Sequence, residues 1–170
     1  MNTRSFRLII VLVLAMVFAG SLVTHSAQAA SVAPRKALLE RINVVRARYG
    51  LAHVLPAAKL RGAAQRHSID MLHRNYFAHT SPVGSSVYTR ITNSGFVSGY
   101  SSWLGGETLA WGTGSLEGAH ATVYAWMHSP EHRAILLSSK FRWIGISREC
   151  GRYHGFANAC VWTADWVTRS

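Results

Sequence analysis

Apolar residues recur at helical spacing over the first two thirds of the chain. Leu38, Ile42, Val45 and Tyr49 fall at i, i+4, i+7 and i+11, which predicts a helix over residues 34–50 that ends at a glycine. Further helices are expected at about residues 56–74, 86–93, 115–128 and 129–137.

The last third of the chain changes to a strand pattern. Residues 141–147 and 159–167 are rich in β-branched and aromatic side chains, and they predict two strands joined by a glycine-containing hairpin. Residues 95–114, rich in Gly, Ser and Trp, are assigned no helix or strand. Helices followed by strands predict the α+β class, with the helices packed on a small antiparallel sheet.

The first 29 residues have the layout of a secretory signal peptide. Arg4 and Arg7 precede an uncharged apolar run over residues 8–20, and Ala27 and Ala29 stand where a signal peptidase needs small residues. The alternative is an uncleaved membrane anchor, but an apolar run of 13 residues is short for a span of about 20. We therefore expect a signal peptide at 1–29, a single domain at 30–170 and a secreted, extracellular protein of bacterial style.

The net charge of the chain indicates which classes of partner are plausible. The chain has 18 basic and 7 acidic residues, a net charge of +11, and +9 once Arg4 and Arg7 leave with the signal peptide. Such a charge favours anionic partners such as a membrane surface or a cell-wall polymer, and it equally serves plain solubility. The arginines are scattered without a nucleic-acid-binding motif, so we expect no nucleic-acid partner and a monomer.

Cys150 and Cys160 predict a disulfide rather than a catalytic cysteine.

Two histidines flank a helix boundary near residue 129. His128 and His132 have the spacing of zinc ligands on one helix face, but Pro130 breaks the helix between them, which excludes the HExxH pattern. Ser129 is predicted to cap the next helix through its side chain, with Pro130 at the first position. His132 in the first turn should stay neutral, because the positive helix end disfavours an imidazolium.

A second set of residues is more attractive for chemistry: His79, Glu107 and His132. His79 lies in a predicted loop. Glu107 is a solitary acid beside two glycines, and it is either a functional residue or a structural carboxylate that accepts hydrogen bonds from the backbone of the glycine turn. Two imidazoles and a carboxylate suit a divalent metal such as zinc, or a proton-transfer pair without metal. His67 lies on an apolar helix face and is expected to be a satisfied core residue. No Gly-x-Ser-x-Gly nucleophile motif occurs in the sequence.

Several short motifs follow one another in a characteristic order. They are Ile42–Leu51, Ala64–Met71, Tyr76–Pro82, Gly106–Ala110, Trp126–Arg133, Ile144–Ile146 and Val161–Thr163. Together they resemble the CAP superfamily of cysteine-rich secretory proteins, antigen 5 and pathogenesis-related proteins, in its short bacterial SCP-like form. The likeness covers residues 36–167.

The resemblance implies a three-layer α-β-α sandwich with a central antiparallel sheet and a cleft. In the family this cleft holds two histidines and two glutamates that bind a divalent metal, and His79, Glu107 and His132 match three of the four. The second glutamate has no match here. Glu131, which stands where bacterial members have glycine, is the candidate fourth member.

Members of the family do not share one activity; their roles include sterol or lipid binding, interaction with proteins or membranes, toxicity and proteolysis. We expect an exported binding module for a lipid or cell-envelope component, with a cleft for a divalent metal. The alternatives are a metal-dependent or acid–base hydrolase that uses His79, Glu107 and His132, and a secreted toxin or host-interaction factor. Whether the protein is an enzyme stays open at this stage, with a binding role favoured.

Overall fold

The computed structural model describes residues 33–170, and residues 34–170 form one compact unit. The signal peptide predicted at residues 1–29 lies outside the described residues. Residues 33–48 are helical. The elements that follow are β1 (Leu55–Pro56), α2 (Ala58–Arg74), α3 (Val87–Asn93), β2 (Trp103–Gly112), the 3₁₀ helix η1 (Gly114–Glu117), α4 (Ala119–His128), α5 (Pro130–Leu136), β3 (Trp143–Tyr153) and β4 (Phe156–Arg169).

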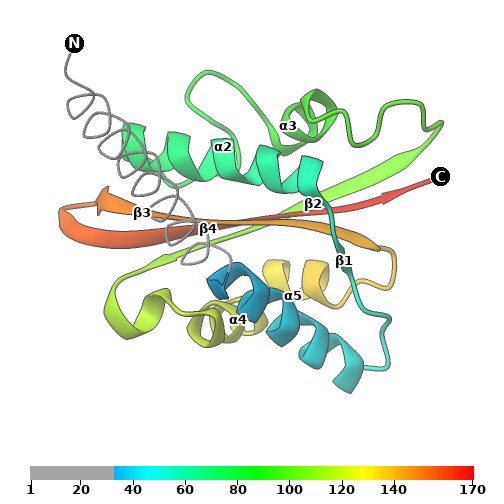
Figure 1. Cartoon of the computed structure of the whole chain (residues 1–170), viewed down its shortest axis with the longest axis horizontal. Coiled ribbons are helices and arrows are strands. Elements are labelled where there is room, and N and C mark those ends of the chain that lie inside the picture. Colours follow the sequence, from blue (N-terminus) through cyan, green and yellow to red (C-terminus); the bar gives the residue numbers. More distant parts are fainter. Residues whose placement is uncertain (1–32) are drawn as a thin grey trace, which may run out of the picture. The chain divides into compact units, whose positions relative to one another are not determined.

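The compact unit has three layers (Figure 1). Its sheet has the order β1-β3-β4-β2, with antiparallel β3–β4 and β2–β4 pairs. Helices α2 and α3 cover one face, and helix 33–48, α4 and α5 cover the other. The α+β sandwich expected from the sequence is therefore confirmed. The sheet also holds one short parallel pair, between β1 and β3, that was not predicted.

Alternation along the strands divides the core between the two faces. Trp162 and Trp166 pack with Trp126 of α4 on one face, whereas Val167 packs with Leu60 of α2 on the other. Successive side chains of a strand point to opposite faces, so each strand of the sheet serves both layers. The middle strands are consequently buried on both sides.

The predicted helices are found close to their expected bounds, with two differences. Gly118 ends η1, and α4 starts only after it, so the helix predicted over 115–128 is two elements. Ser129 occupies the N-cap of α5, but the structure of residues 33–170 gives its side chain no capping hydrogen bond, so that prediction was wrong. The first turn is held instead by Pro130 and by the Arg133 N–H, which donates to Ser129 O at 2.8 Å.

The two strands predicted from the sequence are correctly located, but both are longer than predicted. β3 and β4 run further than expected and meet in a hairpin whose turn residues, His154 and Gly155, have φ of 48° and 86°. Two positive φ values mark a type I′ turn, which matches the twist of the strands. Cys150 and Cys160 pair across this hairpin in the predicted disulfide. Within residues 33–170, no helix is long and apolar enough to cross a membrane.

Candidate functional site

Three separate elements bring His79, Glu107 and His132 to one place. His79 comes from the loop between α2 and α3, Glu107 from the middle of β2, and His132 from the first turn of α5. The Nδ1 atom of His79 lies 2.7 Å from Oε1 of Glu107. The ring centres of His79 and His132 are 6.2 Å apart. The residues selected from the sequence thus form one cluster, as a shared site requires.

Glu107 is the buried centre of this cluster. Its side chain is only 1% exposed, and its Oε2 accepts a hydrogen bond from Nη2 of Arg90 at 2.7 Å. Burial alone would raise the pKa of Glu107, but the hydrogen bond from His79 and the charge of Arg90 hold that pKa below its usual range. The lowered pKa favours the carboxylate form of Glu107, and both of its oxygens accept hydrogen bonds.

His79 is oriented by that carboxylate. An ionised carboxylate only accepts hydrogen bonds, so Nδ1 of His79 carries the proton and Nε2 remains for another partner. The His79 side chain is 53% exposed, which leaves this nitrogen accessible. The hydrogen bond to Glu107 raises the pKa of His79, against the effect of burial. Arg90 also donates to the backbone oxygen of His79 at 2.8 Å, so one arginine fixes both partners.

His132 has the opposite electrostatic environment. Burial lowers its pKa, and the charge of neighbouring His79 lowers it further, while Glu131 acts in the other direction. The lowered pKa is in the direction of the neutral state expected from the sequence, and burial rather than the helix end is its leading cause. Glu131 lies on the exposed first turn of α5, and its charge raises the pKa of both histidines.

Two other histidines have the structural roles expected of them. His67 is buried at 2% exposure, and its Nε2 lies 3.0 Å from Ala78 O, so it is a satisfied core residue. The same nitrogen is 3.9 Å from Oε2 of Glu107, which adds His67 to the wall behind the site. His128 is exposed at the end of α4, where it stacks on Tyr124 with ring centres 4.0 Å apart.

Sequence reasoning missed Arg90 and Asp165. Arg90 is the last charged residue before the uncharged stretch that holds Glu107, and the cost of burying a lone acid was a signal that such a partner was needed. Asp165 lies opposite Glu107 on β4 and is fully buried. In the described chain neither of its carboxylate oxygens has a hydrogen-bond partner, and burial followed by the charge of Glu107 raises its pKa well above the usual value.

The arrangement has two chemical capabilities. Metal-bound histidines commonly donate their second ring N–H to a carboxylate, which is what His79 does toward Glu107. Two histidines whose pKa values are moved apart also resemble an acid–base pair. Among residues 33–170, no three His, Cys, Asp or Glu side chains are already placed as a complete metal-ligand set.

The chain was compared with known protein families, sequences and structures. A family model described as the cysteine-rich secretory protein family, CAP, matches residues 39–166. An uncharacterized protein of Bacillus subtilis, YkwD, is 32% identical over 145 residues, or 85% of this chain and 51% of that protein. An uncharacterized membrane protein of the same organism, YlbC, is 32% identical over 65% of this chain and 30% of its own length. The chain thus spans about half of the first relative and less than a third of the second.

Solved structures show the same architecture. An extracellular protein containing an SCP domain from Bacillus anthracis has a TM-score of 0.64 and 25% identity, over 81% of this chain and 41% of its own. An outer surface protein from Borrelia burgdorferi has a TM-score of 0.68 over 82% of this chain and 95% of its own. At 22% identity, the second likeness concerns the fold alone.

Proposed function

The chain belongs to the cysteine-rich secretory protein (CAP) family, and we propose that it is an exported binding module whose His79 and His132 hold a divalent metal ion such as zinc. The observation that carries this proposal is the side-by-side placement of the two rings, 6.2 Å between centres, with Glu107 hydrogen-bonded behind His79. A bound zinc ion would act there as a Lewis acid that polarises an oxygen of the ligand.

The donor set fits such an ion. Zinc lies about 2 Å from a ligating imidazole nitrogen and so about 3 Å from the ring centre, which puts two rings that share an ion about 5–6 Å apart. The rings are 6.2 Å apart here, so the exposed His79 ring needs to move only slightly to share an ion with His132. Glu107 was predicted as a third ligand, but both of its oxygens already accept hydrogen bonds, so it acts by fixing the ring of His79. Glu131 is the acid whose carboxylate is left to approach the ion, together with water.

A metal titration tests this proposal. Protein prepared without a histidine tag is stripped of metal and titrated with zinc by calorimetry. We expect one site, lost or weakened at least about tenfold in His79→Ala and in His132→Ala. His128→Ala is the matched control, because His128 is exposed, lies four residues before His132 and stacks on Tyr124 at the end of α4. Equal zinc binding by wild type and the double variant His79→Ala/His132→Ala would disprove the site.

The ligand that we propose is a component of the cell envelope, either a lipid or a wall polymer. Support comes from the net charge, which is +9 without the predicted signal peptide and favours anionic surfaces, and from a solved structure of 25% identity described as an extracellular protein. Export of this chain is part of the same proposal. Co-sedimentation with isolated wall polymer and with anionic vesicles, with and without zinc, separates the two ligands, and the absence of binding to either would contradict the proposal.

A second candidate function is hydrolysis, and the divergent pKa values of the two histidines favour it. His132 tends to be neutral and suits a general base, whereas His79 keeps its proton more readily and suits a general acid. Hydrolysis of envelope polymers and peptides by wild type, His79→Ala and His132→Ala tests this role. Activity that is lost in both variants would establish it, and activity that survives His132→Ala would remove His132 from the mechanism.

A further inference from the structure

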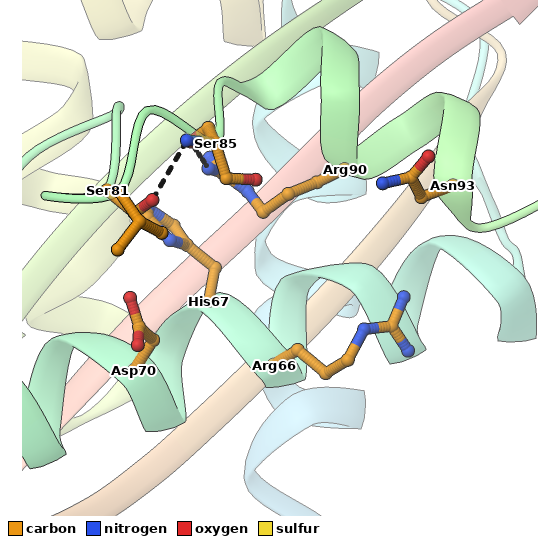
Figure 2. A pocket seen from close by; sticks show the side chains of 8 residues that line it. Arg66, His67, Asp70, Ser81, Ser85, Arg90 and Asn93 are labelled. Atoms are coloured by element: carbon orange, nitrogen blue, oxygen red, sulfur yellow. Dashed lines mark hydrogen bonds between the residues drawn. The ribbon is translucent and has the colours of Figure 1, made fainter.

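We propose that the cavity between α2 and the segment that leads into α3 binds a phosphoryl group. Figure 2 shows this cavity, which lies next to the histidine cluster but contains neither His79 nor His132. Its volume is about 280 Å³, and its lining is Arg66, His67, Asp70, Ser81, Val83, Ser85, Arg90 and Asn93. The inference does not depend on the metal site proposed above.

The lining offers hydrogen-bond donors that have no other partner. Arg66 is exposed on α2 and forms no ion pair or hydrogen bond within residues 33–170. Arg90 is 92% buried, and its Nε is one of the few buried polar atoms of the described chain without a partner. Ser81 Oγ accepts the Ser85 N–H at 3.0 Å and keeps its own proton free to donate.

The one carboxylate of the lining is already paired. Asp70 accepts from Tyr76 OH at 2.6 Å and from Arg74 Nε at 2.8 Å. His67 Nε2 lies 3.0 Å from Ala78 O, and because a carbonyl oxygen accepts, this nitrogen donates to it and is not available to a ligand. A cavity with free donors, whose one carboxylate is already paired, favours a ligand that is rich in acceptor oxygens.

The charges around the cavity point to an anion. Arg90 is neutralised by Glu107, and Arg74 neutralises Asp70. Arg66 is left as an uncompensated positive charge on the exposed side of α2, where Figure 2 shows it facing Asn93 of α3. An anion that enters from solvent therefore meets a guanidinium first and the buried donors second, which is the order that steers a charged ligand inward.

A phosphoryl group matches these donors better than a carboxylate. The donors come from α2, from the loop of Ser81 and Ser85, and from α3, so they surround a ligand rather than face it from one side. A phosphate presents more acceptor oxygens than a carboxylate, and guanidinium groups pair with them through two parallel bonds. A water molecule occupies about 30 Å³, so the cavity also has room for part of the molecule that carries the phosphate.

The phosphate can come from a soluble ester or from the headgroup of a lipid. The test begins with inorganic phosphate, titrated into the full chain at constant ionic strength and followed by amide chemical shifts. We expect saturable shifts at residues that line the cavity, such as Ser81 and Ser85, and weaker binding of acetate. Glycerol 3-phosphate and vesicles of phosphatidylcholine with or without phosphatidic acid then identify the source.

Two variants decide the outcome. Arg66→Ala removes an exposed charge without a structural partner and should weaken phosphate binding about tenfold, whereas Ser81→Ala removes the hydroxyl with a free proton and should weaken it less. Arg48→Ala is the matched control, because Arg48 is an exposed arginine on helix 33–48 in the opposite layer. Absent shifts in the wild type, equal effects of Arg66→Ala and Arg48→Ala, or acetate binding as tight as phosphate would each overturn the proposal.

Discussion

Glu107 and Asp165 lie directly opposite each other on the adjacent strands β2 and β4, and both are buried. Only Glu107 has partners, since His79 and Arg90 donate to its two oxygens. Two neighbouring buried carboxylates cannot both ionise without a large cost in free energy. The carboxylate that has His79 and Arg90 as partners is therefore the one favoured to ionise. The hydrogen bond from His79 and the charge of Arg90 lower the pKa of Glu107, whereas burial followed by the charge of Glu107 raises the pKa of Asp165 and favours its protonated form.

This division predicts the effect of Asp165→Asn, which mimics the protonated acid at every pH. A carboxyl group whose pKa is raised in the folded state binds its proton more tightly there, so its contribution to stability is lost as the pH rises. The variant should match wild type near pH 4 and exceed its free energy of unfolding by about 1 kcal/mol or more near pH 8. Urea unfolding at the two pH values measures this.

Asp70→Asn provides the contrast for that experiment. Asp70 accepts bonds from Tyr76 and Arg74, so its replacement should lower stability at neutral pH instead of raising it. A stability difference for Asp165→Asn that does not change between the two pH values would show that Asp165 is ionised in the folded protein.

Glu107→Gln should lower the pKa of His79. The hydrogen bond to Glu107 is the leading cause of the raised pKa of that ring, and an amide cannot supply the negative charge. The substitution also leaves the buried Arg90 without its ionised partner, which should cost about 3–5 kcal/mol of stability. Proton NMR titration of the histidine rings measures the shift, with His128 as the internal control. An unchanged His79 titration would show that the ring does not hold its proton through Glu107.

Gly145 of β3 sets how closely α2 approaches the sheet. It pairs with Asp165 of β4, across the edge of β4 that does not face β2. A Cβ at this position would overlap the backbone of Leu60 and Arg61, so Gly145→Ala must push α2 outward. We expect a loss of about 2–4 kcal/mol in the free energy of unfolding. Gly151→Ala is the control on the same strand, because nothing in the described structure lies within 4 Å of its added Cβ. The control should stay within about 0.5 kcal/mol of wild type, and similar losses for both would contradict this account.

The sequence was most informative where a local signal exists. Helix periodicity and helix breakers such as Pro130 located the helices. Glu107 was recognised as a candidate because burying an isolated acid without a partner is costly. Strand β2 was not predicted because its buried residues do not alternate with exposed ones and it includes Gly105 and Gly106, so neither alternation nor β-propensity marks it. Strand β1 has only two residues, which is too few to show an alternating pattern.

The rest of the site depends on contacts between distant segments. Asp165 stands in an apolar strand and carries no local sign that it faces Glu107, because that pairing depends on the register of β2 against β4. Arg90 lies on a seven-residue helix with no distinguishing motif, yet it joins Glu107 to the loop of His79. Pair geometry of this kind arises only when the sheet and its covering helices are assembled.

A buried arginine outside the site holds the helix that carries His132. Arg46, on helix 33–48, is 0% exposed. Its Nη1 donates to Leu136 O at 2.7 Å and to Ser138 O at 2.9 Å, at the end of α5, and its Nε donates to Ala52 O at 2.9 Å. Carbonyls at a helix end favour a cation, so Arg46 anchors α5 from its C-terminal side.

Arg46→Met should therefore reduce both stability and zinc binding. The apolar side chain fills similar space but leaves buried carbonyls of Leu136 and Ser138 without donors, which should cost about 3 kcal/mol or more. Release of α5 should also weaken zinc binding about tenfold, because His132 is no longer held opposite His79. Arg41→Met, an exposed change on the same helix, should alter neither quantity. Lost stability with unchanged zinc affinity would show that α5 keeps its place without Arg46.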